Sequence, residues 1–381
     1  MRILHILTDS NTGGAGILLE NLLRCTSLPK EDICVALPRG AAMAERYADC
    51  GVRVEELPIR PDASFCLGDL SRIGKFLHRE RPDILHTHAA LGARLAAMQN
   101  RIPVRIATRH CAYPVGNFAG SLPMRMLHRA TERALTSLTV ATAEAAVKNL
   151  RQLGIPQERI CLIRNGAMPL KGLSCAARLE LRDSLGIPGD AFVVGAVGRM
   201  VPVKGFLTLL GAAKILLSQH TGVHFLLVGG GEQEEILHRA AEAPPLRGRV
   251  IFTGEVRDVS SFVNLFDVAV NCSVGTETSC LALSEAMSLG IPCIASDFGG
   301  NPELVREGEN GLLFPAGDPA ALAERITRLM HDRALLHRLA KGAETRYRRD
   351  LHAMGMAAAY DGLYRRLWEE YLVKRKANGK G

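Results

Sequence analysis

Short apolar runs alternate along the chain with longer stretches in which apolar residues recur at helical spacing. A short apolar run between turn residues is typical of a buried strand, and apolar positions three and four residues apart are typical of a helix packed on a sheet. Predicted strands in the first half of the chain lie at 3–8, 33–37, 52–57, 84–87, 106–108 and 138–141. The pattern restarts at 192–198 and repeats at 225–228, 250–252, 268–271 and 291–295.

The alternation of strands with helices predicts parallel sheets covered by helices on both faces, with ligands at the carboxyl ends of the strands. A chain of 381 residues is also too long for one typical core. We therefore expect an α/β fold with two Rossmann-like domains, at residues 1–170 and 186–349. A linker is expected at 171–188, and closing helices at 350–376.

Composition indicates a globular protein, because 47% of the residues are hydrophobic. No run approaches the roughly 20 apolar residues that span a bilayer, so we expect no transmembrane helix. The start, MRILHIL, lacks the apolar region and cleavage site of a secretory signal. The ten cysteines form no Cys-x-x-Cys pair, and those in apolar runs are expected to be reduced, buried thiols (Cys34, Cys161, Cys272 and Cys293). A cytoplasmic location is the expectation.

Two glutamates and a predicted helix start lie together in the segment 275–300, GTETSCLALSEAMSLGIPCIASDFGG. The carboxylates of Glu277 and Glu285 can each accept hydrogen bonds from neighbouring hydroxyls, and the helix start near Ser279 offers N–H groups and positive potential to a phosphate. Sugar hydroxyls, ribose hydroxyls and a diphosphate together describe a nucleotide sugar. Taken alone, the spacing also suits an ordinary loop, helix and strand that carry two acids by coincidence.

Two cations follow the strand that begins the second half, in the sequence GRMVPVKG. Arg199 and Lys204 there can stabilise the negative charge that develops on a departing diphosphate. The chain has no Asp-x-Asp triplet with which to hold a metal-bound nucleotide. We therefore expect no metal and no cofactor at this site.

A glycine-rich turn, Gly13 to Gly16, follows the first strand. It lacks the Gly-x-Gly-x-x-Gly spacing of a dinucleotide site, and the second strand ends at Pro38 without a carboxylate, so a hydride-transfer enzyme is not expected. The turn is either structural or a backbone loop that approaches a phosphate or an acceptor, since glycine permits close approach.

Several motifs occur in one order along nearly the whole chain: NTGGAG (11–16), DILHTH (83–88), ATRH (107–110), IRNG (163–166), VGRMVPVKG (197–205), LLVGGGE (226–232), FTGEV (252–256), the Glu-x7-Glu pair and GGNPELVREGENGLLF (299–314). In this order they resemble the family-4 retaining glycosyltransferases. The resemblance implies the GT-B architecture, two Rossmann-like domains facing across a cleft. It further implies that the C-terminal helix crosses back onto the first domain.

The resemblance also implies roles for individual residues. His110 would contact the donor sugar, Arg199 and Lys204 the leaving diphosphate, Glu277 the sugar and Glu285 the ribose. The remaining residues that we expect to bind the donor are Gly14, Gly16, Gly254, Val256, Ser279 and Leu281. Cys111 departs from the residue that often follows the family's histidine, which leaves the local loop conformation open.

His86 and His88 alternate along one predicted strand and therefore share a face. A zinc site needs three or four ligands, and no further ligand cluster is evident in the sequence. We interpret both histidines as packing or cleft-lining residues.

These observations predict an enzyme that transfers a sugar from a nucleotide diphosphate donor, with a UDP-sugar favoured, to an acceptor hydroxyl. Retention at the anomeric carbon follows from the resemblance alone. The acceptor is expected to be a lipid-linked or polysaccharide glycan precursor. A sugar-nucleotide epimerase of the same fold and a non-catalytic membrane-associated protein with a degenerate site are the alternatives.

The formal net charge of +8 is concentrated in three basic clusters. They are Arg72 with Lys75, Arg79 and Arg81; Arg125 with His128, Arg129 and Arg133, interleaved with Met126, Leu127 and Leu135; and Lys374 to Lys376 with Lys380. Either these are solvated helix faces, or they dock on the anionic inner face of a membrane. Nucleic acid is not an expected partner, because only 5% of residues are aromatic and no stacking platform is evident.

Overall fold

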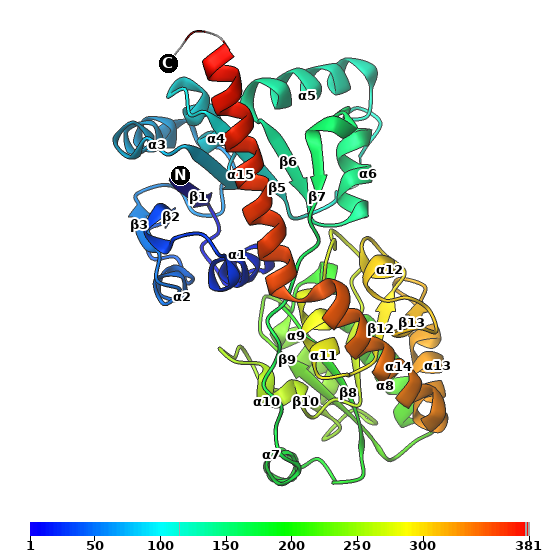
Figure 1. Ribbon diagram of the computed structural model, residues 1–381. Helices are drawn as coiled ribbons and strands as arrows, with labels where there is room; N and C mark the ends of the chain where they lie inside the picture. Colours follow the sequence, from blue (N-terminus) through cyan, green and yellow to red (C-terminus); the bar gives the residue numbers. More distant parts are fainter. Residues whose placement is uncertain (114, 378, 380–381) are drawn as a thin grey trace. The chain divides into compact units, whose positions relative to one another are not determined.

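The computed structural model describes residues 1–113, 115–377 and 379, and it consists of two α/β units (Figure 1). Unit 1 comprises Met1–Gly166 and Ala353–Gly381, and unit 2 comprises Ala167–His352. Each unit has its own parallel sheet.

The sheet of unit 1 has the strand order β3-β2-β1-β4-β5-β6-β7. Its strands are β1 (Ile3–Leu7), β2 (Ile33–Pro38), β3 (Arg53–Leu57), β4 (Ile84–His88), β5 (Val104–Arg109), β6 (Leu138–Ala141) and β7 (Ile160–Leu162). All neighbours pair in parallel, so the loops after the strands gather at one edge. The order reverses between β1 and β4, and such a reversal is where open α/β sheets bind ligands.

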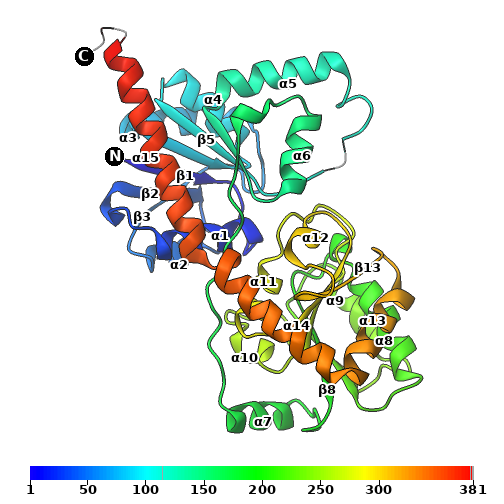
Figure 2. The ribbon, with the colours of Figure 1, turned by 45° about the vertical axis from the view of Figure 1, so that its right-hand side comes forward.

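The helices of unit 1 are α1 (Gly14–Cys25), α2 (Ala44–Ala48), α3 (Leu67–Glu80), α4 (Leu91–Gln99), α5 (Leu122–Leu135), α6 (Glu144–Gln152) and α15 (Ala353–Ala377). In Figure 2, α15 runs along unit 1, where it packs against α1. Asp361 of α15 is buried and accepts hydrogen bonds from Thr26 Oγ1, at 2.5 Å, and from the backbone N–H of Ser27, at 2.7 Å. These charge-assisted bonds tie α15 to the end of α1.

The sheet of unit 2 has the order β10-β9-β8-β11-β12-β13 and is also parallel. Its strands are β8 (Phe192–Val197), β9 (Val223–Val228), β10 (Val250–Phe252), β11 (Val268–Asn271), β12 (Cys293–Ser296) and β13 (Gly311–Phe314). The helices are α7 (Cys175–Ser184), α8 (Phe206–Leu217), α9 (Glu234–Ala241), α10 (Ser260–Val263), α11 (Leu281–Ser288), α12 (Asn301–Leu304), α13 (Pro319–His331) and α14 (Arg333–Arg346). Two separate apolar clusters pack against the sheet, one containing Leu209 and Ile326 and the other containing Leu283 and Met287.

The prediction of a linker at 171–188 is wrong. This segment contains α7, whose first turn is capped by the Ser174 hydroxyl, which accepts from the Ala177 N–H. Arg182 of α7 is buried and forms an ion pair with Asp267, which binds the helix to unit 2. Strand β13 is an element that the apolar pattern did not predict, because its four residues are too few to stand out.

All ten cysteines are free thiols. Cys34, Cys272 and Cys293 are buried as expected, and Cys161 is half-buried. Burial raises the pKa of Cys34 to about 11, so this thiol is protonated at neutral pH. Among the described residues, no helix has both the length and the apolar character needed to cross a bilayer.

Candidate active site

The predicted donor residues of unit 2 all lie in loops or helix starts that follow parallel strands. Arg199 and Lys204 follow β8, Gly254 and Val256 follow β10, and the segment from Glu277 to Glu285 follows β11. Because the strands are parallel, their carboxyl ends share one edge of the sheet. The structure therefore brings to one edge residues that are far apart in sequence.

Lys204 and Glu277 form an ion pair at the centre of this edge. Lys204 Nζ lies 2.6 Å from Glu277 Oε2, and the exposed fractions of the two side chains are 28% and 7%. Lys204 ends a short 3₁₀ turn, Pro202–Lys204, and Gly205 follows it with φ of +68°. A Cβ on Gly205 would lie 2.1 Å from the carbonyl oxygen of Cys272, so only glycine fits the close approach of the two loops.

The ion pair shifts the pKa of both groups. Burial alone would raise the pKa of Glu277, but the nearby Lys204 ammonium and the hydrogen bonds to the carboxylate outweigh burial and hold the pKa below its usual value. Burial would likewise lower the pKa of Lys204, and the charge of Glu277 raises it instead. Both groups are therefore charged at neutral pH, and each depends on the other for that charge.

A network of buried, hydrogen-bonded polar side chains holds the Glu277 carboxylate in place. Oε2 of Glu277 also accepts hydrogen bonds from Ser273 Oγ at 3.0 Å and from Asn271 Nδ2 at 3.5 Å. Asn301 Nδ2 donates to Asn271 Oδ1 and to Ser296 Oγ, and the Ser296 hydroxyl donates to the carbonyl of Ser273. These supporting residues were not among the candidates predicted from the sequence. The available signal was a polar residue at the carboxyl ends of two otherwise apolar strands, VAVN and CIAS.

The glycine pair of the 299–314 motif packs on the backbone beside Glu277. A Cβ on Gly300 would lie 1.7 Å from the Thr278 carbonyl oxygen, and one on Gly299 would lie 2.2 Å from the Glu277 carbonyl oxygen. The Gly300 N–H donates to that carbonyl of Glu277 at 3.2 Å. The two glycines therefore fix the position of the glutamate, a role that the sequence did not disclose.

Helix α11 carries the second glutamate. Cys280 is its N-cap, Leu281 is its first residue, and Ser279 lies just before it, so the helix starts where the sequence predicted. Glu285 is half-buried in the second turn. The first N–H groups of a helix carry partial positive charge, and α11 presents them from Leu281, two residues beyond Ser279.

The loop after β10 is joined to the glycine-rich loop after β9. The Gly229 N–H donates to the carbonyl of Gly254 at 3.0 Å, and Gly254 has φ of +68°. A Cβ on Gly229 would lie 2.2 Å from the Gly198 carbonyl oxygen, so the LLVGGGE motif packs against the loop that carries Arg199. Val256 is half-buried against the apolar cluster that contains Leu283.

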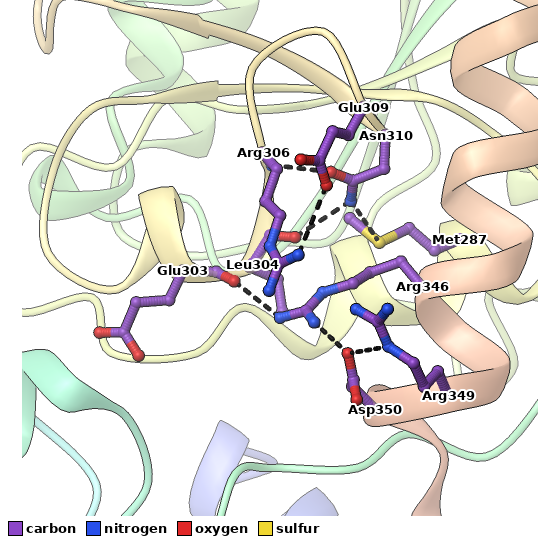
Figure 3. A network of polar contacts seen from close by, with 9 residues as sticks. All are labelled: Met287, Glu303, Leu304, Arg306, Glu309, Asn310, Arg346, Arg349 and Asp350. Atoms are coloured by element: carbon purple, nitrogen blue, oxygen red, sulfur yellow. Dashed lines mark hydrogen bonds and ion pairs between the residues drawn. The ribbon is translucent and has the colours of Figure 1, made fainter.

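Figure 3 shows how the segment after the glycine pair is held in unit 2. The guanidinium of Arg346 on α14 donates to the carbonyl of Glu303 at 2.9 Å and pairs with Asp350. Asn310 accepts from the N–H of Arg306 and donates to the carbonyl of Leu304. The carboxylate of Glu303 points away from these arginines in Figure 3.

In unit 1 the glycine-rich turn opens α1. Gly14 is exposed at the first position of the helix, where nothing lies within 4 Å of a Cβ position. Gly16 is buried, and a Cβ there would lie 3.0 Å from Met43 Cγ. The Tyr47 hydroxyl donates to the Gly16 carbonyl at 3.0 Å. Gly16 therefore has a packing role against α2 in addition to any ligand role.

His110 follows β5 at the same edge of the sheet as Gly14 follows β1. Its Nε2 lies 2.9 Å from Nδ1 of His88, which is buried in β4. Burial lowers the pKa of His110 to about 4, so the imidazole is neutral at neutral pH. The structure also places His5 of β1 beside His86 and His88, a neighbour that was not predicted from the sequence because His5 lies about 80 residues away.

The structure shows which side chains of the three basic clusters are paired and which are exposed. Arg72 and Arg79 on α3 pair with Asp69 and Glu80, which offsets their charge. On α5, Leu135 is buried, whereas the rest of the helix carries exposed apolar and basic side chains (Leu122, Arg125, Met126, Leu127, Arg129 and Arg133). Lys374 to Lys376 are exposed at the end of α15, and Lys380 lies outside the described residues.

Comparison with known proteins identifies the family. Residues 12–168 match the family model described as Glycosyltransferase Family 4, and residues 177–346 match the model described as Glycosyl transferases group 1. The chain is a family-4 glycosyltransferase. Its two parallel α/β units are the two Rossmann-like domains of the GT-B fold.

Individual relatives agree with this family. The chain is 27% identical over 270 residues to the UDP-Gal:alpha-D-GlcNAc-diphosphoundecaprenol alpha-1,3-galactosyltransferase of Escherichia coli, covering 68% of this chain and 70% of that protein. It is 36% identical over 165 residues to the lipopolysaccharide core biosynthesis glycosyltransferase LpsE of Rhizobium meliloti, covering 43% and 47%. The crystal structure of Anabaena HepE in complex with UDP and glucose superposes with a TM-score of 0.82 at 23% identity, covering 96% of this chain and 99% of that chain.

Replacing Lys204 with alanine should destabilise unit 2 by about 3 kcal/mol at neutral pH, because it leaves the buried Glu277 carboxylate without its cation. The double variant Lys204→Met/Glu277→Gln should recover much of this loss, since neither partner is then charged. Chemical denaturation of the wild type, the single variants Lys204→Met and Glu277→Gln, and the double variant gives the coupling energy.

The pH dependence of stability is a second test of the ion pair between Lys204 and Glu277. A carboxyl group with a lowered pKa in the folded state stabilises the fold above its ordinary value of 4.5, and this contribution is lost as the pH falls through the lowered pKa. As the pH falls, the free energy of unfolding should therefore decrease less in Lys204→Ala than in the wild type. Equal stability of the wild type and this variant across the range would contradict a coupled pair.

Proposed function

We propose that this glycosyltransferase moves a sugar from a UDP-sugar to a hydroxyl of a lipid-linked or polysaccharide glycan precursor, with retention at the anomeric carbon. The observation that carries the proposal is the Lys204–Glu277 pair at the carboxyl edge of the unit 2 sheet. The pair combines a cation for a diphosphate with a carboxylate for sugar hydroxyls. The UDP and glucose bound by the HepE neighbour, and the UDP-Gal donor and diphosphoundecaprenol-linked acceptor in the name of the E. coli relative, support the choice of substrates.

Different residues bind different parts of the donor. Arg199 and Lys204 neutralise the diphosphate, and the N–H groups at the start of α11 beside Ser279 and Leu281 add positive potential. Glu277 accepts hydrogen bonds from the sugar, and Glu285 accepts them from the ribose. The loop at Gly254 and Val256 meets the nucleobase. His110 and the turn at Gly14 and Gly16 keep the roles that the family resemblance implies, contact with the transferred sugar and the donor.

The reaction that fits these residues is a displacement on one face of the sugar. The bond from the anomeric carbon to the diphosphate oxygen breaks, and the departing oxygen takes the proton of the acceptor hydroxyl. The acceptor oxygen then bonds to the anomeric carbon on the face that the diphosphate leaves. Because Lys204 already neutralises Glu277, that carboxylate is a weak candidate for a covalent nucleophile.

The two alternatives are less well supported. An epimerase would release an altered nucleotide sugar without an acceptor, and a non-catalytic protein would have no use for a charged, hydrogen-bonded Glu277. Product analysis distinguishes the three functions, since only a transferase makes product formation depend on the acceptor.

Glu277→Gln should lower kcat for transfer by about 10² to 10³, the usual loss when one electrostatic group at a reacting centre is removed. Saturating UDP, at a hundred times its dissociation constant, should stabilise the wild type by about 2.7 kcal/mol, and GDP or ADP at the same concentration should stabilise it less. Glu324→Gln, an exposed glutamate on α13, is the matched control and should transfer normally. Near-normal turnover of Glu277→Gln would overturn the assignment, and an inverted anomer by NMR would overturn retention.

We further propose that the cations replace a metal. Saturating EDTA should then leave the rate of transfer unchanged, because Arg199 and Lys204 supply the positive charge that a metal ion supplies elsewhere. Initial rates with and without EDTA test this directly. A loss of activity that magnesium or manganese restores would show that the two cations are insufficient.

We also propose peripheral docking of α5 on an anionic membrane on the inner face. The helix carries Leu122, Met126 and Leu127 with 70%, 64% and 55% exposure, together with exposed Arg125, Arg129 and Arg133. An amphipathic helix of this kind inserts its apolar side chains while its arginines meet the headgroups, each worth about 1 kcal/mol. Figures 1 and 2 place the basic end of α15 at the same end of unit 1 as α5.

Substituting glutamine for Arg125, Arg129 and Arg133 should weaken binding to anionic vesicles about a hundredfold, from the loss of three headgroup contacts. Glutamine at three exposed arginines of unit 2 (Arg239, Arg338 and Arg348) is the charge-matched control and should bind as the wild type does. Sedimentation with anionic and neutral vesicles at low and high salt measures the effect. Equal binding of the α5 variant and the wild type would leave a soluble acceptor as the better account.

A further inference from the structure

Three histidines of unit 1 form a continuous row from the interior of the sheet to its carboxyl edge. His5 lies on β1, His88 on β4, and His110 immediately after β5. These strands are neighbours, and His5 pairs with His86 and His88 with Thr108 in the parallel register. Alternate residues of a strand share a face, so the side chains of the row all project from one face of the sheet.

The rings are joined end to end by hydrogen bonds. His5 Nδ1 lies 3.3 Å from His88 Nε2, and His88 Nδ1 lies 2.9 Å from His110 Nε2. The two pairs of ring planes are nearly parallel, at 27° and 23°, with centroids 5.6 and 5.1 Å apart. Each centroid separation exceeds its N···N distance by about the width of one ring, so the hydrogen bonds lie along the lines that join the rings.

The three imidazoles are neutral. His5 and His88 are each 1% exposed. Burial lowers the pKa of His5 to about 3 and also lowers that of His88, and no buried charge would be tolerated here without a partner. A neutral imidazole has one N–H donor and one acceptor nitrogen. His88 must therefore donate on one side and accept on the other.

This constraint leaves two arrangements of the protons. If His88 Nδ1 donates to His110, then His5 Nδ1 donates to His88, and the proton of His110 is on its remaining nitrogen, Nδ1. If His88 Nε2 donates to His5, then His110 donates from Nε2 and its Nδ1 is an acceptor. The hydrogen-bonding character of His110 Nδ1 is therefore coupled to His5, two hydrogen bonds away.

We propose that His5 and His88 are positioning residues that hold His110 in a single tautomer and so decide whether its Nδ1 donates to, or accepts from, a ligand hydroxyl. The catalytic consequence rests on the proposed role of His110 in sugar contact, whereas the tautomer itself does not. A wrong tautomer of a catalytic histidine is costly, since loss of the orienting partner in a serine protease lowers kcat by about 10⁴.

The geometry does not favour a metal ion among His5, His86 and His88, although one nitrogen of each lies within 4.8 Å of the others. His86 already has hydroxyl partners at both nitrogens, Tyr364 at 2.7 Å and Thr108 at 2.6 Å. Its ring is stacked on that of His88, with centroids 4.4 Å apart and an angle of 29°. Lone pairs lie in the ring plane, so stacked rings do not direct them at a common point. His86 instead holds the ring of His88 in place.

The test measures the His110 tautomer directly, by long-range ¹H–¹⁵N correlation spectra of protein labelled at histidine, assigned with His110→Gln. The wild type should show one tautomer for His110. His5→Leu removes the far end of the row, so His110 should become a mixture of tautomers although it keeps its hydrogen bond to His88. His5→Asn keeps an amide near the Nδ1 position and should give less mixing than leucine.

In the transfer assay, kcat of His5→Leu should fall with the population of the wild-type tautomer, about two- to tenfold for a mixed population, with KM for the donor unchanged. Tyr364→Phe is the matched control, because it removes a hydroxyl that bonds to His86, outside the row, and keeps the ring that lies edge-on to His5. It should leave the His110 tautomer and kcat unchanged.

An unchanged His110 tautomer in His5→Leu, a mixture already present in the wild type, or stoichiometric zinc in the purified protein would each overturn the inference. Failure of the proposed function would look different. In that case His110→Gln would transfer sugar normally while the tautomer of His110 still responded to His5→Leu.

Discussion

The ion pair between Lys204 and Glu277 is the interaction on which the candidate site depends. A carboxylate as buried as Glu277 would be protonated without compensation, and a protonated carboxyl group accepts fewer hydrogen bonds from a sugar. Lys204, Ser273 and Asn271 all donate to one oxygen, Oε2, and so keep the group ionised. The same lysine is also the proposed cation for the diphosphate. Binding of the donor would therefore change the surroundings of both charges at once.

Parallel sheet topology explains how distant residues reach this pair. Strands β8, β11 and β12 are neighbours and end at one edge, which brings together the loop with Lys204, the loop with Glu277 and the glycines at 299 and 300. The loops touch backbone to backbone, and the close approaches at Gly205 and Gly300 leave no room for a Cβ. Packing of the loops, rather than the length of any side chain, thus sets the geometry of the charged groups.

Much of the fold could be predicted from the sequence, because apolar runs and turn residues mark buried parallel strands well. The failures have physical causes. The segment predicted as a linker contains helix α7, whose apolar residue Leu179 is exposed in the structure and so does not mark a buried face. Strand β13 has only four residues, too few to stand out as a separate apolar run. Motif spacing indicated Glu277 and Lys204 as candidates, but their mutual contact depends on the register between two strands that are far apart in sequence.

The histidines of unit 1 are a further case in which contacts between distant strands could not be predicted from the local sequence. The alternation in DILHTH shows that His86 and His88 share a face, and a strand end makes His110 a candidate, but nothing in the local sequence joins them to His5. Only the sheet order β1-β4-β5 makes these side chains neighbours. Once they are neighbours, burial removes their charges, and neutrality forces each ring to be both donor and acceptor. A chemical property of a residue at the edge of the sheet is thereby determined in its interior, by a residue that no ligand needs to touch.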